Sequence, residues 1–303
     1  MKLVNPDVVE IIESDPLKKI ELAARTCYKS ESKISEDSAA KMFDNLVQRH
    51  HYAMLEHATF AFIVTDLDLY VKLSKLDFIQ HSRVRINDKL RFMISGNLRA
   101  LNDTGILEVG VALYKINPKL SYYFNDSNVF KHYVVSNQME LNGGKLIYVP
   151  NLTDIGDITE EEKFEHIYRT LRFTCDRGVT HEIVRHRLCS FAQESTRYVN
   201  YNNHELTYII PADYDSWSKE LRDIFLGSLE LSSNAYLNMI KKGASPQQAR
   251  AVLPTEIKSE IVVTANMTEW HHFINLRSNE CTGPVHPNMK VVADKAKAIL
   301  YGI

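Results

Sequence analysis

The sequence has no long apolar run, no excess of charge and no paired-cysteine motif. No window of the 303 residues approaches the roughly 18 uninterrupted apolar residues of a membrane span, and the start, MKLVNPDVVEIIESDP, lacks the basic flank of a secretory signal. We therefore expect a cytoplasmic protein that does not bind membranes. Its 36 basic and 38 acidic side chains nearly cancel. No strong overall field draws the protein to nucleic acid, and any bound anion must be held locally.

The cysteines are scattered. Cys27, Cys175, Cys189 and Cys281 never form a CxxC pair, which fits reduced thiols better than a disulfide frame or a zinc knuckle. Each is predicted to be a small buried hydrophobe. The chain also lacks internal repeats and linkers rich in Gly or Ser. Strands and helices follow one another without regular βαβ alternation, and this mixture favours an α+β fold.

Local patterns predict elements along most of the chain. Helices are predicted after the start signals at 14–16, 35, 159–162 and 245–248, and over 68–80, 217–242, 266–277 and 289–300. Strands are predicted where apolar residues alternate, at 60–64, 171–175 and 257–263. A turn at 176–178 is expected to precede a short helix capped by Thr180. From about 66 to 155 the pattern weakens, notably over 122–142, and we interpret this stretch as an elaboration.

The segment 181–201, HEIVRHRLCSFAQESTRYVNY, concentrates cationic and hydrogen-bonding side chains. Arg185, His186 and Arg187 are consecutive, so on a helix they would point about 100° apart. They would suit a ligand that surrounds the helix end, or two ligands that meet there. An arginine fork matches phosphate oxygens, and arginines with serine hydroxyls form a plausible phosphate cradle. The alternative is a set of solvated charges, or ion pairs with Glu182 and Glu194.

The spacing RHRxxSxxxxSxR over 185–197 resembles the signature of the flavin-dependent thymidylate synthases. Further blocks look like that family in its order: AARTCYKS at 23–30, HHYAMLEHATFAF at 50–62, ARAVLP at 249–254 and TANMTEWHHFINLR at 264–277. The resemblance covers most of 1–65 and 165–303. It implies an antiparallel sheet flanked by helices, in one domain over 1–303 with an insertion at about 66–155.

The resemblance also implies an activity. Members of this family methylate dUMP to dTMP, with 5,10-methylenetetrahydrofolate as carbon donor and NADPH-reduced FAD as hydride source. Reduced flavin performs the redox chemistry, and the protein has to orient its ligands and stabilise charge. The implied enzyme is a homotetramer with active sites shared between subunits. No metal and no nucleic-acid partner is expected.

Site residues are implied at matching positions. Arg277 is expected at the pyrimidine, where a fixed cation favours the anionic and more nucleophilic ring. The residues implied to contact dUMP are Arg185, Gln193, Glu194, Ser195, Thr196, Arg197, Arg250 and Arg277. The residues implied to contact FAD are His51, Arg185, His186, Arg187, Gln193, Asn266 and His272.

Three positions depart from the family pattern. Glu182 stands where many members have a glutamine that faces the nucleotide, and a carboxylate there would repel a phosphate or need a proton. Ala53 replaces a hydroxyl residue beside the flavin and removes one hydrogen bond. The stretch 283–287, GPVHP, interrupts the segment after Arg277, so no contact is expected from it.

Other interpretations of single residues stay open. Cys189 beside Arg187 could be an activated nucleophile. Ser195 could be one only with a base and an orienting group, and no Ser-His-Asp arrangement is evident. A metal site could involve His50, His51, Glu56 and His57, although their spacing is not HExxH. The residues Trp270, His271 and Phe273 are predicted to be core or interface rather than a stacking platform.

Two other functions fit part of the pattern. One is a flavin- and folate-dependent methyltransferase that acts on another pyrimidine or on RNA uridine. The other is a non-catalytic nucleotide-binding or RNA-binding module that retained an arginine-rich cleft. The near-neutral charge and the absence of repeated aromatic and basic patches argue against RNA binding.

Overall fold

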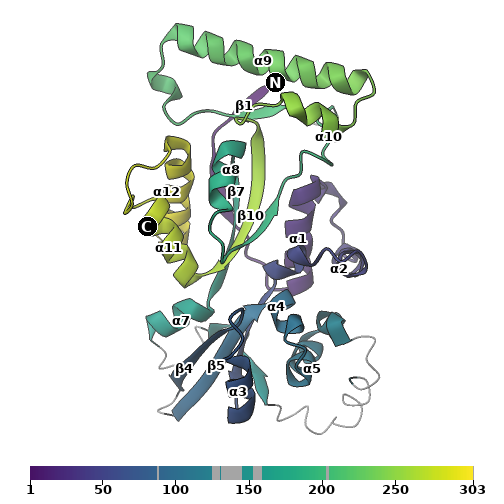
Figure 1. The fold of residues 1–303 in the computed structure, drawn as a ribbon, viewed down its shortest axis with the longest axis vertical. Coiled ribbons are helices and arrows are strands. Elements are labelled where there is room, and N and C mark those ends of the chain that lie inside the picture. The colour runs from purple at the N-terminus through teal and green to yellow at the C-terminus, as the bar shows by residue number, and fades with distance from the viewer. Residues whose placement is uncertain (87–88, 125–129, 131–144, 153–158, 203–204, 303) are drawn as a thin grey trace.

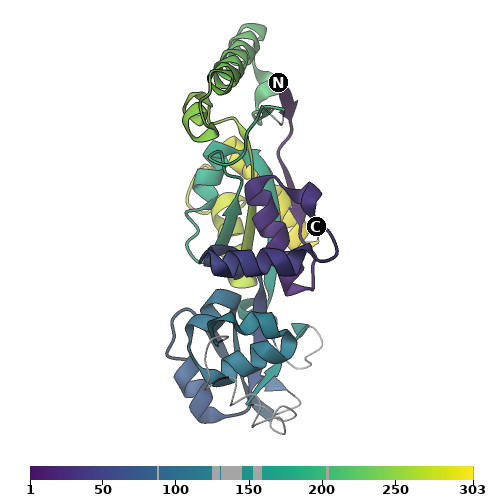
Figure 2. The same cartoon turned by 90° about the vertical axis from the view of Figure 1, so that its right-hand side faces the viewer.

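Helices and antiparallel sheets form an elongated molecule (Figures 1 and 2). The computed structural model describes residues 1–86, 89–124, 130, 145–152, 159–202 and 205–302. One four-stranded sheet lies at the centre with helices on both sides, a second lies at one end, and the long helix α9 lies at the other end. No helix in these ranges is long and apolar enough to cross a membrane.

The bounds of the elements are as follows. The helices are α1 Pro16–Tyr28, α2 Ser38–Gln48, α3 Leu67–Leu73, α4 Leu98–Asp103, α5 Leu107–Ile116, α7 Glu160–His166, α8 Arg177–Ile183, α9 Lys219–Lys241, α10 Pro246–Ala249, α11 Met267–Arg277 and α12 Pro287–Tyr301. The strands are β1 Lys2–Val4, β2 Asp7–Glu10, β3 Thr59–Val64, β4 Gln80–Ile86, β5 Lys89–Asn97, β6 Leu146–Tyr148, β7 Tyr168–Asp176, β8 Ser190–Gln193, β9 Thr207–Ile209 and β10 Lys258–Asn266. Short 3-10 turns occur at Glu31–Lys33, Tyr52–His57, Pro118–Phe124, Tyr214–Ser216 and Arg250–Val252.

The central sheet separates two layers of helices. Its strands run antiparallel in the order β2-β7-β10-β8. Because side chains alternate along a strand, Ile261 and Val263 of β10 pack with the core under α8, α11 and α12, whereas Val262 packs with Ala23 of α1 on the other face. The 3-10 turn at Tyr52–His57 lies on the α1 side. A residue therefore belongs to one face or the other, which decides which site residues can meet.

The structure corrects the expected start of α8. Asp176 caps this helix by accepting a hydrogen bond from the backbone N–H of Val179, at 2.7 Å. Arg177 and Gly178 are then the first helical residues, and Thr180 lies inside the helix instead of capping it. The helix ends at Ile183, so the RHR segment lies in the following loop, and Ser190–Gln193 form strand β8. The expectation that these residues lie on a helix was wrong.

Most other local predictions are confirmed. Asp15 caps α1, and the capping boxes at Thr159 and Ser245 are both formed. The strands predicted at 60–64, 171–175 and 257–263 occur as β3, β7 and β10, and the helices predicted over 217–242, 266–277 and 289–300 occur as α9, α11 and α12. The helix predicted over 68–80 is shorter, because α3 ends at Leu73 and the chain from Gln80 pairs with β5.

The second sheet crosses the expected insertion boundary. Its antiparallel strands run in the order β4-β5-β3-β6. Strand β3 precedes residue 66, yet it pairs with β5 and β6 from the elaboration. His166 of α7 joins this sheet to the rest of the chain, since its ring nitrogens lie 2.6 Å from Ser82 Oγ and 2.8 Å from Ser95 Oγ. Much of the stretch 122–142 lies outside the described residues.

The antiparallel prediction holds for the two four-stranded sheets but not for the remaining strand pair. Strands β1 and β9 are parallel, with Leu3 opposite Tyr208. This pair packs with α9 around a small core that includes Tyr208 and Tyr236. The end of the molecule that carries α9 is thus built separately from the central sheet.

Candidate functional site

His186 is the residue of the RHR segment that turns inward. It is buried, whereas Arg185 and Arg187 are exposed. Its Nε2 accepts a hydrogen bond of 3.3 Å from Nε of Arg277, the last residue of α11. Nη1 of the same guanidinium lies 2.9 Å from Oε2 of Glu182, in the last turn of α8. Glu182, His186 and Arg277 form what we call the Arg277 cluster.

The imidazole in this cluster is neutral. Burial, the charge of Arg277 and the nearby His272 lower the pKa of His186 from 6.5 to about 4. A neutral ring whose Nε2 accepts a hydrogen bond carries its proton on Nδ1. Its ring centroid lies 4.9 Å from that of Phe273 and 6.0 Å from that of His272. His186 therefore orients the guanidinium without changing its charge.

Three predicted ligand contacts surround this cluster at the surface. Arg185 and Arg187 flank His186 in the loop, and His272 lies one helical turn before the end of α11; all three are exposed. Within the described residues, neither arginine has a carboxylate within ion-pair distance. Two uncommitted guanidinium forks at one edge are chemically suited to a diphosphate group.

A second group gathers at the end of β8. Arg250 Nη1 donates a hydrogen bond to Oγ1 of Thr196, at 3.3 Å, and Arg197 Nε donates to Oε1 of Gln247, at 3.0 Å. Ser195 is tied to the α1 side, because its backbone N–H donates to the carbonyl of Cys27 at 2.9 Å. The structure thus brings together Ser195, Thr196, Arg197 and Arg250, which the resemblance assigns to dUMP.

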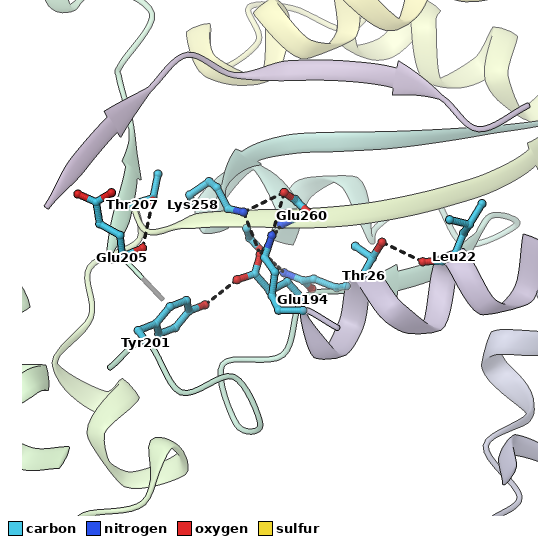
Figure 3. A network of polar contacts seen from close by, with 11 residues as sticks. Leu22, Thr26, Glu194, Tyr201, Glu205, Thr207, Lys258 and Glu260 are labelled. Carbon is cyan, nitrogen blue, oxygen red and sulfur yellow. Dashed lines mark hydrogen bonds and ion pairs between the residues drawn. The ribbon is translucent and has the colours of Figure 1, made fainter. Parts of the chain in front are cut away.

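Glu194 lies directly before this group but offers no free oxygen to a ligand. Its carboxylate is 1% exposed and lies 3.4 Å from Lys29 Nζ and 3.3 Å from Lys258 Nζ. It also accepts hydrogen bonds from Tyr201 Oη at 2.9 Å and from the backbone N–H of Glu260 at 3.2 Å. Figure 3 shows Glu194, Tyr201, Lys258 and Glu260 turned toward one another. These contacts give Glu194 a supporting role within the chain, and its contact with dUMP stays a prediction.

This buried charge network was missed by sequence reasoning. Glu260 Oε1 lies 2.9 Å from the ammonium groups of both Lys29 and Lys258, so two carboxylates and two ammonium groups compensate one another. Lys29 follows α1, Glu194 follows β8, and Lys258 and Glu260 lie in β10. Lys29 has a left-handed backbone, with φ of 49°, which no local pattern indicates. The network fixes the start of the segment that carries Ser195 to Arg197.

His51 lines a separate cavity of about 360 Å³ on the α1 side. The other residues that line it are Cys27, Tyr28, His50, Tyr52, Ala53, Met54 and Arg99. Tyr28 also lies against Tyr198, with ring centroids 5.7 Å apart, so the cavity adjoins the segment after β8. Arg99 comes from the elaboration and pairs with Glu56 at 2.9 Å. The elaboration therefore contributes a wall to a cavity that holds a predicted flavin contact.

Two predicted flavin contacts are occupied within the chain. Asn266 caps α11 by accepting from the backbone N–H of Glu269, at 2.9 Å, and donates to the carbonyl of Glu165, at 3.1 Å. Gln193 donates to Thr180 Oγ1 at 2.6 Å. Asn266 is also buried. These contacts give both amides a structural role within the chain, and their contact with a flavin stays a prediction.

The predicted residues thus fall into two sets on opposite faces of the central sheet. The Arg277 cluster lies with α8 and α11, whereas His51 lies on the α1 side (Figure 1). Arg277 is bound to Glu182 and His186, whereas Arg250 and Arg197 are bound to Thr196 and Gln247. Within one chain the arginines therefore have different partners.

The structure bears on several of the open interpretations. Burial raises the pKa of the Cys189 thiol to about 12, which argues against an activated thiolate. The described residues contain no group of three or more potential metal ligands, and His57 is buried with Nδ1 2.8 Å from Thr264 Oγ1. Trp270 and Phe273 belong to the core as predicted, while His271 is exposed. Of the cysteines, Cys281 is exposed, contrary to expectation.

Comparison with known proteins gives one family match. A sequence model of the family described as "Thymidylate synthase complementing protein" matches residues 8–73 and 151–302. Flavin-dependent thymidylate synthases are among the similar proteins: that of Pyrococcus abyssi is 33% identical over 140 residues, or 43% of this chain and 53% of that protein. That of Corynebacterium glutamicum is 33% identical over 145 residues, or 43% of this chain and 57% of that protein.

The chain spans about half the length of the curated relatives it matches. Among solved structures, a UMP/dUMP methylase PolB from Streptomyces cacaoi bound with 5-Br dUMP is similar at a TM-score of 0.43 and 13% identity, over 100% of this chain and 93% of that one. The family match leaves residues 74–150 uncovered, and these include most of the second sheet.

Proposed function

Because the chain belongs to the thymidylate synthase complementing protein family, we propose that it is a flavin-dependent thymidylate synthase. It methylates dUMP to dTMP, with methylenetetrahydrofolate as carbon donor and NADPH as the source of reducing equivalents for FAD. One observation supports the proposal most directly. Arg185 and Arg187, which have no carboxylate partner among the described residues, lie in a loop beside Arg277, whose guanidinium the neutral His186 orients. We further propose one catalytic domain interrupted by an insertion, because the family match stops at residue 73 and resumes at 151.

The residues present fit a flavin dinucleotide. Arg185 and Arg187 offer planar forks for its diphosphate, and His272 lies beside them at the surface. His51 lines a cavity with aromatic walls that suits a planar ring. When bound, FAD supplies the hydride. Asn266 then acts by capping α11, and Gln193 and Glu194 act by fixing the start of the nucleotide segment.

The chain's own chemistry is electrostatic. Arg277 would lie at the pyrimidine and stabilise negative charge that develops on the ring, and His186 would hold its guanidinium in place through Nε. Ser195, Thr196, Arg197 and Arg250 would hold the nucleotide, with Thr196 and Arg250 already in contact. No thiol is required, which agrees with the protonated Cys189.

The arrangement of the two faces supports active sites shared between copies in a homotetramer. Arg277 and His51 lie on opposite sides of one sheet, so a pocket that uses both must combine residues of different subunits. Helix α9 offers a surface for assembly, since Leu221, Ile224 and Leu231 are 54%, 70% and 73% exposed along it. Light scattering measures the oligomeric state of wild type and of Ile224→Asp. A tetramer is expected for wild type and a smaller species for the variant, whereas a wild-type monomer would contradict shared sites.

Tritium release from dUMP labelled at C5 tests the activity. Release that requires FAD, NADPH and methylenetetrahydrofolate together is expected. Arg277→Ala should abolish it while the circular dichroism spectrum stays unchanged, and Arg197→Ala should chiefly raise KM for dUMP. Arg85→Ala, an exposed arginine of β4, is the matched control and should keep full activity. No release from dUMP with all components present would point to another pyrimidine or to RNA uridine.

A further inference from the structure

We propose that Glu182 is an internal counter-ion of Arg277, which competes with the nucleotide for this guanidinium and so sets the affinity for the substrate. The inference rests on the proposed function. It concerns the position at which the resemblance to the family leads us to expect a glutamine. Glu182 is a positioning residue in this account, because it acts through Arg277.

Two hydrogen bonds hold the guanidinium of Arg277. Nη1 of Arg277 lies 2.9 Å from Glu182 Oε2, and Nε donates to Nε2 of His186 at 3.3 Å. These two bonds come from different nitrogens and fix the plane of the group. Nη2 has no acceptor among the described residues. The guanidinium is thus held in one orientation with one nitrogen left for a ligand.

Glu182 compensates the positive charge of Arg277. His186 is neutral, so it offers Arg277 a lone pair and no negative charge. Glu182 is the one carboxylate that pairs with Arg277 in the part of the chain that the structure describes. Before a ligand arrives, the cation is therefore largely compensated. An anionic pyrimidine gains the full attraction of Arg277 only after Glu182 has moved or lost its contact.

The ion pair of Arg277 and Glu182 is partly exposed to solvent. The side chains of Arg277 and Glu182 are 20% and 26% exposed, respectively, so water reaches both and the pair is weak enough to open. Because Glu182 is partly exposed, water can solvate its carboxylate once it has left Arg277.

The variant Glu182→Gln tests the inference in the holoenzyme. Glutamine keeps the shape and can still accept from Arg277, but it removes the competing charge. We expect KM and the dissociation constant for dUMP to fall about fivefold, the scale of one partly exposed ion pair. kcat should change less, because His186 still orients Arg277. Raising the salt concentration should narrow the difference between the two proteins.

Two further variants make the test specific. Glu182→Asp keeps the charge but shortens the side chain, so its dUMP affinity should fall between wild type and Glu182→Gln. Glu161→Gln removes the same charge from an exposed residue of α7 and should leave dUMP affinity unchanged. A dUMP affinity in Glu182→Gln that is equal to or weaker than wild type overturns the inference. An absence of dUMP binding in both proteins overturns the proposed function itself.

Discussion

Replacing Glu260 by glutamine tests the buried charge network that supports the nucleotide segment. Burial alone would raise the pKa of Glu260, but the attraction of Lys258 and Lys29 outweighs it and lowers that pKa from 4.5 to about 2. This fall corresponds to roughly 3 kcal/mol of folding stability near neutral pH. Glu260→Gln should therefore lower the free energy of unfolding by about that amount at pH 7.

The contribution of Glu260 to the free energy of unfolding should decrease as the pH falls. A carboxylate whose pKa is lowered in the folded state stabilises the protein above its unfolded pKa, and this contribution is lost as the pH falls through the folded value. With a folded pKa of about 2, roughly 1 kcal/mol remains at pH 3. Urea unfolding followed by circular dichroism should show the gap between wild type and variant narrowing from pH 7 to pH 3. An equal gap at both values would refute the reasoning, and Glu36→Gln, at an exposed site, is the control.

Three further predictions concern single groups. Burial lowers the pKa of His186 to about 4, so its imidazole should be neutral at pH 7 with the proton on Nδ1. The free energy of unfolding should fall as the pH drops from about 6.5 toward 4, because the unfolded state takes up the proton first. Nitrogen-detected NMR reports the charge and the tautomer of the ring, and a proton on Nε2 would contradict the hydrogen bond from Arg277. A thiol reagent at pH 8 should label the exposed Cys281 much faster than Cys189, and Cys189→Ser should keep turnover; equal labelling would count against the buried thiol. Asp176→Ala removes the cap of α8 and a buried hydrogen bond to α12. It should lower the free energy of unfolding measured in urea by about 2 kcal/mol. A change near zero would contradict the stabilising role of these two bonds.

Signals carried by neighbouring residues predicted much of the fold. Capping boxes at Thr159 and Ser245 and the cap at Asp15 were readable because both partners lie within four residues. Helix α9 ends near Gly243, whose φ of 92° suits glycine. Alternating apolar residues indicated β3, β7 and β10 because each strand has one face or both in a core.

Elements that depend on distant partners could not be predicted in this way. Strand β8 has four residues and becomes a strand by pairing with β10, in the register Phe191 opposite Val263, so nothing local marks it. The helix start at Asp176 was missed because Thr180, four residues later, is also a favoured cap by residue type. The network around Glu194 joins charges up to 231 residues apart, from Lys29 to Glu260. The same limit explains why Glu182 could be flagged as unusual while its partner Arg277 could not be named.

The visible absorption spectrum of the purified protein tests the central claim most directly. In the proposed enzyme, guanidinium groups from several segments bind a flavin and a uracil nucleotide in one pocket. We expect flavin bands in the protein, or their appearance with added FAD, and a shift of these bands when dUMP is added. A protein that binds no FAD, or a flavin spectrum that dUMP leaves unchanged, would contradict it.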